Sequence, residues 1–356
     1  MNGHIVLLPG DGIGPEVTEA ACAVLRAVAT RFGHTFHTAT HLIGGAALRA
    51  TEVPLPDETL QAATTADAVF LGAVGDPAFD QAPPGRRPES ALLAIRKALG
   101  LYANLRPARV WAGLEGSGPL KPSVLAGTDM MVVRELTGGL YYGEPRGLAA
   151  DGQSAHNTLR YSVEEITRVA RVAFELARRR RGRLVSVDKA NVLEVSQLWR
   201  RTVQQLSGEY PEVVLTHEYV DAAAMKLALA PSTIDVLLTE NLFGDILSDE
   251  AGAVCGSLGL LPSASLGARV GLFEPVHGSA PTIAGRDIAN PIGAMASMAM
   301  LLEHSFGLAT EAASITQAID DTLAAGLRTA DIAESGTTPS TTSQFTAAVT
   351  AALARA

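Results

Sequence analysis

Hydrophobic residues along the chain gather in short runs that end at glycine, proline or a charged residue and lead into helix-like segments. Short, mainly apolar runs, typical of buried strands, occupy residues 5–8, 68–72, 184–187 and 234–238. After the first run, Pro15 takes a first-turn position of a helix and Gly33 follows the end of that helix. This repeated order of strand and helix predicts an α/β fold.

Two further helices are indicated by their ends and their patterns. Residues 89–99 (ESALLAIRKAL) form an amphipathic pattern, and residues 162–181 begin with Ser162 as N-cap and Glu165 at the capping-box position. Between these helices, residues 138–161 are rich in glycine and polar side chains and predict turns and hairpin strands. We expect this hairpin to protrude and to pair with another subunit.

Composition indicates a compact protein of about two domains, since the chain has 356 residues, 47% hydrophobic and 18% charged. Its net charge of −9 disfavours nucleic acid and acidic membrane surfaces as partners. The arginine run at 178–181 is better explained as a solvated helix end, and the apolar run at 5–8 is too short for a signal peptide or membrane anchor. Cys22 and Cys255 lie in apolar helical contexts without metal-ligand spacing, so we expect reduced thiols and a cytoplasmic protein.

The first strand leads into the glycine-rich sequence PGDGIGPE. Its glycines at 10, 12 and 14 have the spacing G-x-G-x-G, and no acidic residue follows a second strand where a dinucleotide-binding Rossmann unit would place one. The sequence therefore argues against a Rossmann fold. Two interpretations of the turn stay open, a close backbone approach to a ligand and a plain tight turn.

Three arginines stand at the ends of apolar elements. Arg96 lies in the helix at 89–99, Arg106 precedes Pro107, and Arg134 ends the run MMVVR. A single arginine is usually solvated, but three in these positions in an acidic chain predict a pocket for carboxylates, which the guanidinium group binds with two parallel hydrogen bonds.

The sequence NLFGDILSDEAG, residues 241–252, places Asp245 and Asp249 four residues apart in a segment that is otherwise hydrophobic and helical. On a helix the two carboxylates share one face, where a divalent cation such as Mg²⁺ would offset the cost of burying them. The alternative is an aspartate that complements the helix dipole beside an ordinary solvated one.

Two more polar residues follow apolar runs that lead into helices. Lys189 comes after the strand at 184–187, and Asp221 after the strand at 213–220. In open α/β sheets ligands bind at such carboxyl ends of strands, so Lys189 is a candidate general base.

The motifs described so far, read in order, resemble those of the β-decarboxylating dehydrogenases of 2-hydroxy acids. The resemblance covers nearly the whole chain through LPGDGIGPE, LGLYANLRP, VRELTGGLYYGEPRG, SVDKANVLEVSQLWR, HEYVDAAAM, NLFGDILSDEAG and EPVHGSAP. It is greatest for the branch of the family that acts on isopropylmalate. It implies two α/β domains around a large mixed sheet, one discontinuous on the cofactor side (1–103 and 256–356) and one central for substrate, metal and dimerisation (104–255).

The resemblance also implies roles for the polar residues. The carboxylates of the substrate would be held by Arg96, Arg106 and Arg134, with Tyr141 as acid and Lys189 as base. The metal, Mg²⁺ or Mn²⁺, would be held by Asp221, Asp245 and Asp249. Asp221 would also contact the substrate. Lys189 and Asp221 would come from the second subunit of a homodimer with shared sites.

The reaction implied is NAD-dependent oxidative decarboxylation of (2R,3S)-3-isopropylmalate to 4-methyl-2-oxopentanoate and CO₂ in leucine biosynthesis. The alkyl group at C3 of the substrate would contact Glu89, Leu92, Leu93 and Val192. The cofactor would contact Ile13, Glu274, His277, Gly278, Ser279, Ala280, Thr282, Ala289 and Asn290. NAD-using members of the family typically carry Asp, and NADP-using members Lys, at the position of Thr282, so we expect NAD with weaker rejection of NADP.

Other functions stay open at this point. One is another reaction of the same family, on D-malate, tartrate, an alkylmalate or homoisocitrate. Another is a regulatory subunit without activity, which would have lost a catalytic lysine, tyrosine or aspartate, although none is missing here. The third is a nucleic-acid-binding or scaffold protein that uses the arginine run, which the acidic net charge disfavours.

Overall fold

The computed structural model describes residues 1–83, 85–116 and 118–355 and divides the chain into two compact units. Unit 1 consists of Met1–Leu101, Trp111–Pro119 and Gly256–Ala356, and unit 2 consists of Tyr102–Val110 and Leu120–Cys255. The boundaries expected from the sequence lie close to these, except that Trp111–Pro119 belongs to unit 1 and not to the central unit.

The strands of unit 1 follow the order β2-β1-β3-β12-β11. Neighbouring strands are parallel except β11 and β12, which are antiparallel. Every residue of β3 is buried, as its continuous apolar sequence predicts. The bounds are β1 Asn2–Gly10, β2 Thr35–Thr40, β3 Ala68–Ala73, β11 Pro262–Leu266 and β12 Gly271–Pro275.

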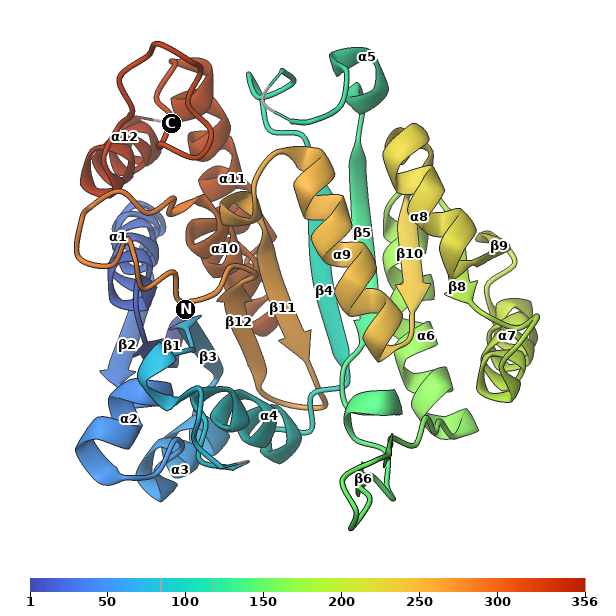
Figure 1. Ribbon diagram of the computed structural model, residues 1–356. Helices are drawn as coiled ribbons and strands as arrows, with labels where there is room; N and C mark the ends of the chain where they lie inside the picture. The colour runs from blue at the N-terminus through green and yellow to red at the C-terminus, as the bar shows by residue number, and fades with distance from the viewer. Residues whose placement is uncertain (84, 117, 356) are drawn as a thin grey trace. The chain divides into compact units, whose positions relative to one another are not determined.

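Helices cover the strands of unit 1 (Figure 1). Of these, α10 packs against β11 and β12, and its small residues and methionines are buried without interruption from 292 to 302. The helix bounds are α1 Gly14–Phe32, α2 Gly44–Thr51, α3 Asp57–Thr65, α4 Pro88–Ala98, α10 Ile292–Phe306, α11 Ala309–Ala324 and α12 Thr342–Arg355, with 3₁₀ turns η1 Pro77–Phe79 and η5 Leu258–Leu260.

The glycine turn between β1 and α1 packs against the loop around Ser279. A side chain at Gly12, where φ is +57°, would place its Cβ 1.9 Å from the Ser279 carbonyl oxygen, and the Ile13 N–H donates to that same oxygen at 2.8 Å. Glycine is needed here because two backbone segments meet. The turn thus makes a backbone-to-backbone contact that its G-x-G-x-G spacing alone did not predict.

The strands of unit 2 follow the order β4-β5-β10-β8-β9, in which only β4 and β5 are antiparallel. Figure 1 shows α9 lying along β4 and β5, against which it packs. The strands are β4 Ala103–Arg109, β5 Asp129–Glu135, β8 Arg183–Asp188, β9 Val214–Tyr219 and β10 Val236–Thr239. The helices are α5 Pro122–Leu125, α6 Val163–Arg179, α7 Glu194–Leu206, α8 Val220–Leu229 and α9 Asn241–Cys255, with 3₁₀ turns η2 Gly139–Tyr141, η3 Ser207–Glu209 and η4 Pro231–Thr233.

Several local predictions for unit 2 are confirmed. The predicted hairpin is present as β6 (Gly147–Leu148) paired antiparallel with β7 (Ala155–His156). At the start of α6 the Ser162 side chain accepts from the Glu165 N–H at 3.2 Å, and the Glu165 carboxylate accepts from the Ser162 N–H at 2.7 Å. These two bonds are the reciprocal pair of a capping box.

Two interpretations need correction. The strand expected at 213–220 is shorter, because β9 ends at Tyr219 and α8 begins at Val220, so Asp221 lies in the first turn of the helix that directly follows the strand. The arginine run is not simply solvated, since the Arg180 Nε donates at 2.9 Å to the carboxylate of Asp235, whose side chain is fully buried.

The predicted α/β class is confirmed, with parallel and antiparallel strands in each unit. The described part of the chain includes no helix whose length and hydrophobicity together would let it cross a membrane.

Candidate active site

The side chains of α9 that face β4 and β5 form a cluster of opposite charges. The Tyr141 hydroxyl donates to Asp245 Oδ2 at 2.7 Å, and Arg134 Nη1 donates to Asp245 Oδ1. Arg106 Nη1 lies 3.1 Å from Asp249 Oδ1, and Arg106 Nη2 lies 3.7 Å from Asp245 Oδ1. Five residues singled out in the sequence analysis therefore meet in unit 2.

Strand register explains why the two arginines of this cluster lie together. On the antiparallel strands β4 and β5, Arg106 stands opposite Val132, and Arg134 stands opposite Asn104. Both partners are two positions away from the other arginine, so Arg106 and Arg134 are diagonal neighbours on one face of the sheet. Asp245 and Asp249, one helical turn apart on α9, approach that face together.

The charges of the cluster set the protonation of its two carboxylates. Burial raises the pKa of Asp245, but the Arg134 guanidinium, the hydrogen bond from Tyr141 and the Arg106 guanidinium together hold that pKa below its ordinary value. Burial raises the pKa of Asp249 above its ordinary value, with the Asp245 carboxylate adding to the rise. Asp245 is thus the more firmly ionised member of the pair.

The environment of Tyr141 keeps its hydroxyl protonated. Burial, the hydrogen bond to Asp245 and the charge of Asp245 raise the pKa of Tyr141 to about 12. A phenol in this state donates a hydrogen bond to Asp245 and holds a proton that it can give to a reacting atom.

Lys189 and Asp221 form a second cluster in unit 2. Lys189 follows the end of β8, and its Nζ lies 2.6 Å from Asp221 Oδ1. The side chains of Lys189 and Asp221 are 28% and 68% exposed, so both are accessible to a ligand or a second chain. The hydrogen bond from Lys189 holds the pKa of Asp221 below its ordinary value.

The three predicted metal-binding aspartates do not form one complete site within a single chain. Among the residues described, no group of three or more His, Cys, Asp and Glu side chains is arranged to hold a metal ion. Asp245 and Asp249 nevertheless suit a hard cation, because both are carboxylates on one face and their side chains are 35% and 55% exposed. They supply two oxygen ligands and leave positions for others.

In unit 1, the predicted substrate residue Arg96 pairs with the predicted cofactor residue Glu274. Arg96 Nη2 donates to Glu274 Oε1 at 2.6 Å, and the two side chains are 9% and 10% exposed. The sequence predicted that Arg96 binds a substrate carboxylate. For this, the Arg96 guanidinium must either leave Glu274 or bind Glu274 and the substrate at the same time. The predicted alkyl-binding residues Glu89, Leu92 and Leu93 lie on the same helix, α4, and Val192 lies in unit 2.

The loop predicted to bind the cofactor presents a buried nitrogen that has no partner. His277 Nδ1 lies 2.9 Å from the Gly278 carbonyl oxygen, whereas Nε2 is buried without a hydrogen bond. Burial lowers the pKa of His277, so the ring is neutral. Buried polar atoms normally have partners, and a base or sugar of a nucleotide would supply one.

The neighbouring cofactor residues are ordered by the fold of unit 1. The Asn290 side chain donates to Asp331 Oδ2 at 3.0 Å and accepts from the Ile292 N–H at 3.0 Å, and Ala289 before it is buried. Thr282 is exposed.

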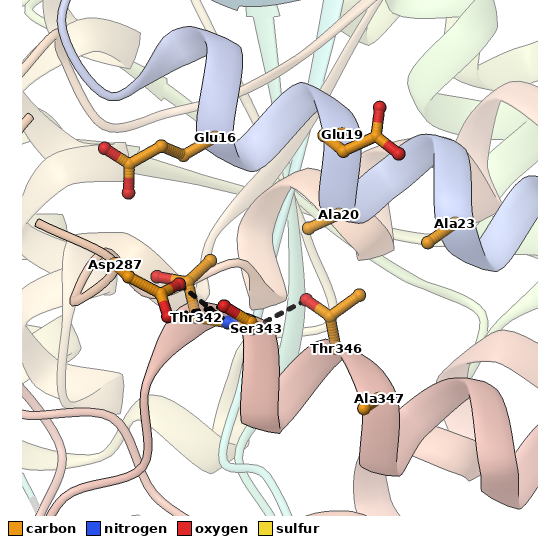
Figure 2. Close-up of a pocket in the computed structure, with 9 residues that line it drawn as sticks. All are labelled: Glu16, Glu19, Ala20, Ala23, Asp287, Thr342, Ser343, Thr346 and Ala347. Atoms are coloured by element: carbon orange, nitrogen blue, oxygen red, sulfur yellow. Dashed lines mark hydrogen bonds between the residues drawn. The ribbon is translucent and has the colours of Figure 1, made fainter. Parts of the chain in front are cut away.

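A groove of about 380 Å³ elsewhere in unit 1 contains none of the predicted site residues (Figure 2). Figure 2 shows Asp287 beside Thr342 and Ser343 at the start of α12, and Glu16 and Glu19 on α1. This acidic lining disfavours the anionic substrate and the phosphates of a dinucleotide.

Sequence reasoning missed polar residues that support the cluster in unit 2. Asn104 and Asn241 accept hydrogen bonds from the Nε atoms of Arg106 and Arg134 at 2.8 and 3.0 Å, and Ser248 accepts from Arg106 Nη1 at 2.7 Å. Asn241 follows the apolar run 234–238 by three residues, at the start of a helix, where an asparagine is usually a helix cap. Its partner is distant in sequence, so no local pattern indicates its role.

Residues 4–349 match the family model described as isocitrate/isopropylmalate dehydrogenase. The chain belongs to this family. It is 55% identical to the 3-isopropylmalate dehydrogenase of Nitratidesulfovibrio vulgaris over 95% of this chain and 96% of that one. It is also 55% identical to the enzyme of that name from Shouchella clausii, over 99% and 98%.

A solved structure agrees with this family membership. This chain superposes on the crystal structure of isocitrate dehydrogenase from Methylococcus capsulatus with a TM-score of 0.88. The two sequences are 35% identical, and the match covers 99% of each chain. The family resemblance seen in the motifs is therefore confirmed, and with it the fold class of isocitrate/isopropylmalate dehydrogenases.

Proposed function

We propose that this chain is a 3-isopropylmalate dehydrogenase, which oxidatively decarboxylates (2R,3S)-3-isopropylmalate to 4-methyl-2-oxopentanoate and CO₂ in leucine biosynthesis, with NAD as the hydride acceptor. Relatives at 53–56% identity over nearly the full chain carry that name. The observation that carries the proposal is the cluster in which Arg106, Arg134 and Tyr141 surround Asp245 and Asp249. No expected catalytic residue is lost, which argues against an inactive regulatory subunit.

Three arginines are proposed to bind the carboxylates of the substrate. Arg106 and Arg134 lie on adjacent strands, so they can hold one carboxylate from one side, and Arg96 is a further cation for the second carboxylate. In the structure these guanidinium groups pair with Asp249, Asp245 and Glu274. A bound dicarboxylate therefore replaces protein carboxylates as the partner of each arginine.

Two residues move protons in this proposal. Lys189, after leaving its pair with Asp221 and releasing its own proton to solvent, accepts the proton of the 2-hydroxyl group as a neutral amine, directly or through water. Tyr141 returns a proton to C3 after CO₂ has left, because its hydroxyl stays protonated in the Asp245 environment. Lys189 then holds one extra proton and Tyr141 lacks one, so transfer of a proton from Lys189 to Tyr141 through solvent restores both, and the overall reaction consumes no proton.

Two bound groups complete the chemistry. A divalent ion, Mg²⁺ or Mn²⁺, held by Asp245, Asp249 and the Asp221 of a second chain, would withdraw electron density from the substrate oxygens. NAD, held by the loop that presents His277, would take the hydride from C2. Asp221 is proposed to come from a second chain because its 68% exposed carboxylate does not join the other two within one chain. The active form is then a homodimer with shared sites.

The preference for an alkyl group at C3 rests on α4. Leu93 is 42% exposed and stands next to Leu92, one helical turn from Glu89, so this face offers alkyl surface to a ligand. Isocitrate would place a third carboxylate there, and neither leucine can pair with it. The cellular compartment proposed is the cytoplasm, which agrees with two buried free cysteines.

Product analysis tests the function. Purified protein with Mg²⁺, NAD and 3-isopropylmalate is expected to form NADH, CO₂ and 4-methyl-2-oxopentanoate in equal amounts, and EDTA is expected to stop the reaction until Mg²⁺ is added in excess. The three products are measured by absorbance, carbonate trapping and chromatography. NADH without CO₂ would show a simple alcohol dehydrogenase and refute the proposal.

Cofactor selectivity gives a second prediction. Thr282 is exposed and uncharged, so it neither attracts nor repels a 2′-phosphate, and we expect Thr282→Asp to raise the ratio of kcat/KM for NAD over NADP several-fold. The uncharged Thr282→Asn serves as control, because it provides hydrogen bonds without repulsion and should leave the ratio close to native. A native preference for NADP, or equal effects of both substitutions, would contradict this assignment.

A further inference from the structure

Asn241, the first residue of α9, is fully buried although it is polar. Its side-chain oxygen accepts from Arg134 Nε at 3.0 Å and from Arg134 Nη2 at 2.8 Å. Its side-chain nitrogen donates to the carbonyl oxygens of Leu136 at 3.1 Å and of Gly138 at 3.0 Å. The amide thus uses both of its N–H groups and both lone pairs of its oxygen, which is its full hydrogen-bonding capacity.

The bonds to Arg134 fix the direction of its guanidinium group. One oxygen that accepts from Nε and Nη2 holds one edge of the planar fork, so the remaining nitrogen, Nη1, points at Asp245. The approach of α9 is close, since a Cβ on Gly244 would lie 2.6 Å from Arg134 Cγ. The Arg134 side chain, which extends from β5, is therefore held by the first turn of α9.

The bonds to Leu136 and Gly138 fix the segment that leads from β5 to Tyr141. This segment is tightly packed, since Gly139 has φ of +72° and a Cβ there would lie 2.5 Å from the Tyr161 hydroxyl oxygen. The same hydroxyl oxygen accepts the backbone N–H of Asn241 at 3.0 Å. Asn241 therefore fixes the position of the turn that carries Tyr141 as well as the direction of the Arg134 guanidinium.

We propose that Asn241 is a positioning residue that sets Arg134 for substrate binding and Tyr141 for proton transfer through opposite ends of one amide group. The proposal rests on the proposed function, in which Arg134 binds a carboxylate and Tyr141 is the acid. A cap of α9 alone would explain the burial of Asn241. It would not explain why the amide oxygen binds an arginine and the amide nitrogen binds the turn that carries a tyrosine.

Two substitutions separate the two ends of the amide. Asn241→Asp keeps an oxygen for Arg134 but replaces the N–H donors with an oxygen that faces two carbonyl oxygens. We expect it to lower kcat about tenfold or more, because the Tyr141 side loses its donors, while KM for 3-isopropylmalate rises less than in Asn241→Ala, since the new carboxylate still holds the Arg134 fork in place although it offsets part of its charge. Asn241→Ala removes both ends, and we expect KM to rise about tenfold in addition to the fall in kcat. In both variants KM for NAD should stay native.

Phe174→Leu is the matched control for loss of stability. Phe174 is fully buried on α6 and stacks on Tyr210 at 4.7 Å between ring centroids, and neither residue belongs to the site. The substitution should lower the melting temperature without changing kcat or KM in assays run well below it. If either Asn241 variant does not fold, Asn241→Ser, which leaves room for a water molecule, takes its place.

The proposal is overturned if folded Asn241 variants keep native kcat and KM as Phe174→Leu does, or if Asn241→Asp raises KM as much as Asn241→Ala. Failure of all three Asn241 variants to fold would assign the residue to stability alone and also overturn it. Failure of the proposed function gives a different result, since the wild-type chain would then show no turnover of 3-isopropylmalate in the same assay.

Discussion

Refolding an equal mixture of Lys189→Ala and Asp245→Asn chains is expected to restore about a quarter of the native activity, although each variant alone is nearly inactive. Loss of the base alone should lower kcat by about 10²–10⁴-fold. If Lys189 of one chain serves the Asp245 site of the other, each mixed dimer holds one doubly damaged site and one intact site. Half of the dimers are mixed, which gives the expected quarter.

The structure provides a matched control for this experiment. Asp245 and Asp249 lie on the same helix of one chain, so a mixture of Asp245→Asn and Asp249→Asn chains damages every site and should stay inactive. Recovery in the first mixture and not in the second is the pattern of a shared site. If the first mixture also stays inactive while its chains form dimers by light scattering, each chain supplies its own Lys189.

Tyr141→Phe is expected to slow the protonation of C3 and to leave the earlier hydride transfer intact. Removing the hydroxyl removes the proton donor but leaves Lys189, so we expect kcat to fall about 10²–10⁴-fold. The first turnover should still form NADH, because the hydride leaves before Tyr141 acts. A stopped-flow experiment should therefore show a burst of NADH that approaches one per site, followed by slow turnover.

Lys189→Ala is the control for that measurement. It lacks the base that precedes hydride loss, so its NADH should form slowly from the start, without a burst. Tyr141→Phe removes a single hydrogen bond to Asp245 from a partly exposed cluster, so we expect it to fold and to bind 3-isopropylmalate. A slow first turnover in Tyr141→Phe would mean that Tyr141 acts before or during hydride transfer, contrary to its proposed role.

Strands with continuous apolar sequence and helices with clear ends could be predicted from the sequence. The strand at β3 and the capping box of α6 are examples, since both depend on residues close together in the chain. The edge strand β2 and strand β11 (Pro262–Leu266, PSASL) were not predicted. β11 has few large apolar residues and is buried because of its tertiary neighbours, α10 among them, whose Ser297 hydroxyl accepts from the Ser263 N–H at 3.3 Å.

In the candidate active site, too, contacts between residues distant in sequence could not be predicted. Motif resemblance indicated the arginines, the tyrosine and the aspartates, and the structure places five of them in one cluster. The hydrogen-bond and ion-pair partners of these residues were not predictable. The pairing of Arg96 with Glu274 joins residues 178 positions apart, and the pairing of Arg134 with Asn241 joins residues 107 apart. Such contacts depend on strand order and not on any local pattern.

The central claim is that this chain acts on a malate with an alkyl group at C3, and the most direct test compares kcat/KM across substrates. 3-Isopropylmalate, other 3-alkylmalates, isocitrate, tartrate and D-malate are assayed separately for NADH formation with the wild-type protein and Mg²⁺. We expect 3-isopropylmalate to have the highest kcat/KM and other alkylmalates to react at reduced rates, since a methylene group is worth about 1–3 kcal/mol in an apolar pocket. A higher value for isocitrate, tartrate or D-malate would contradict the account.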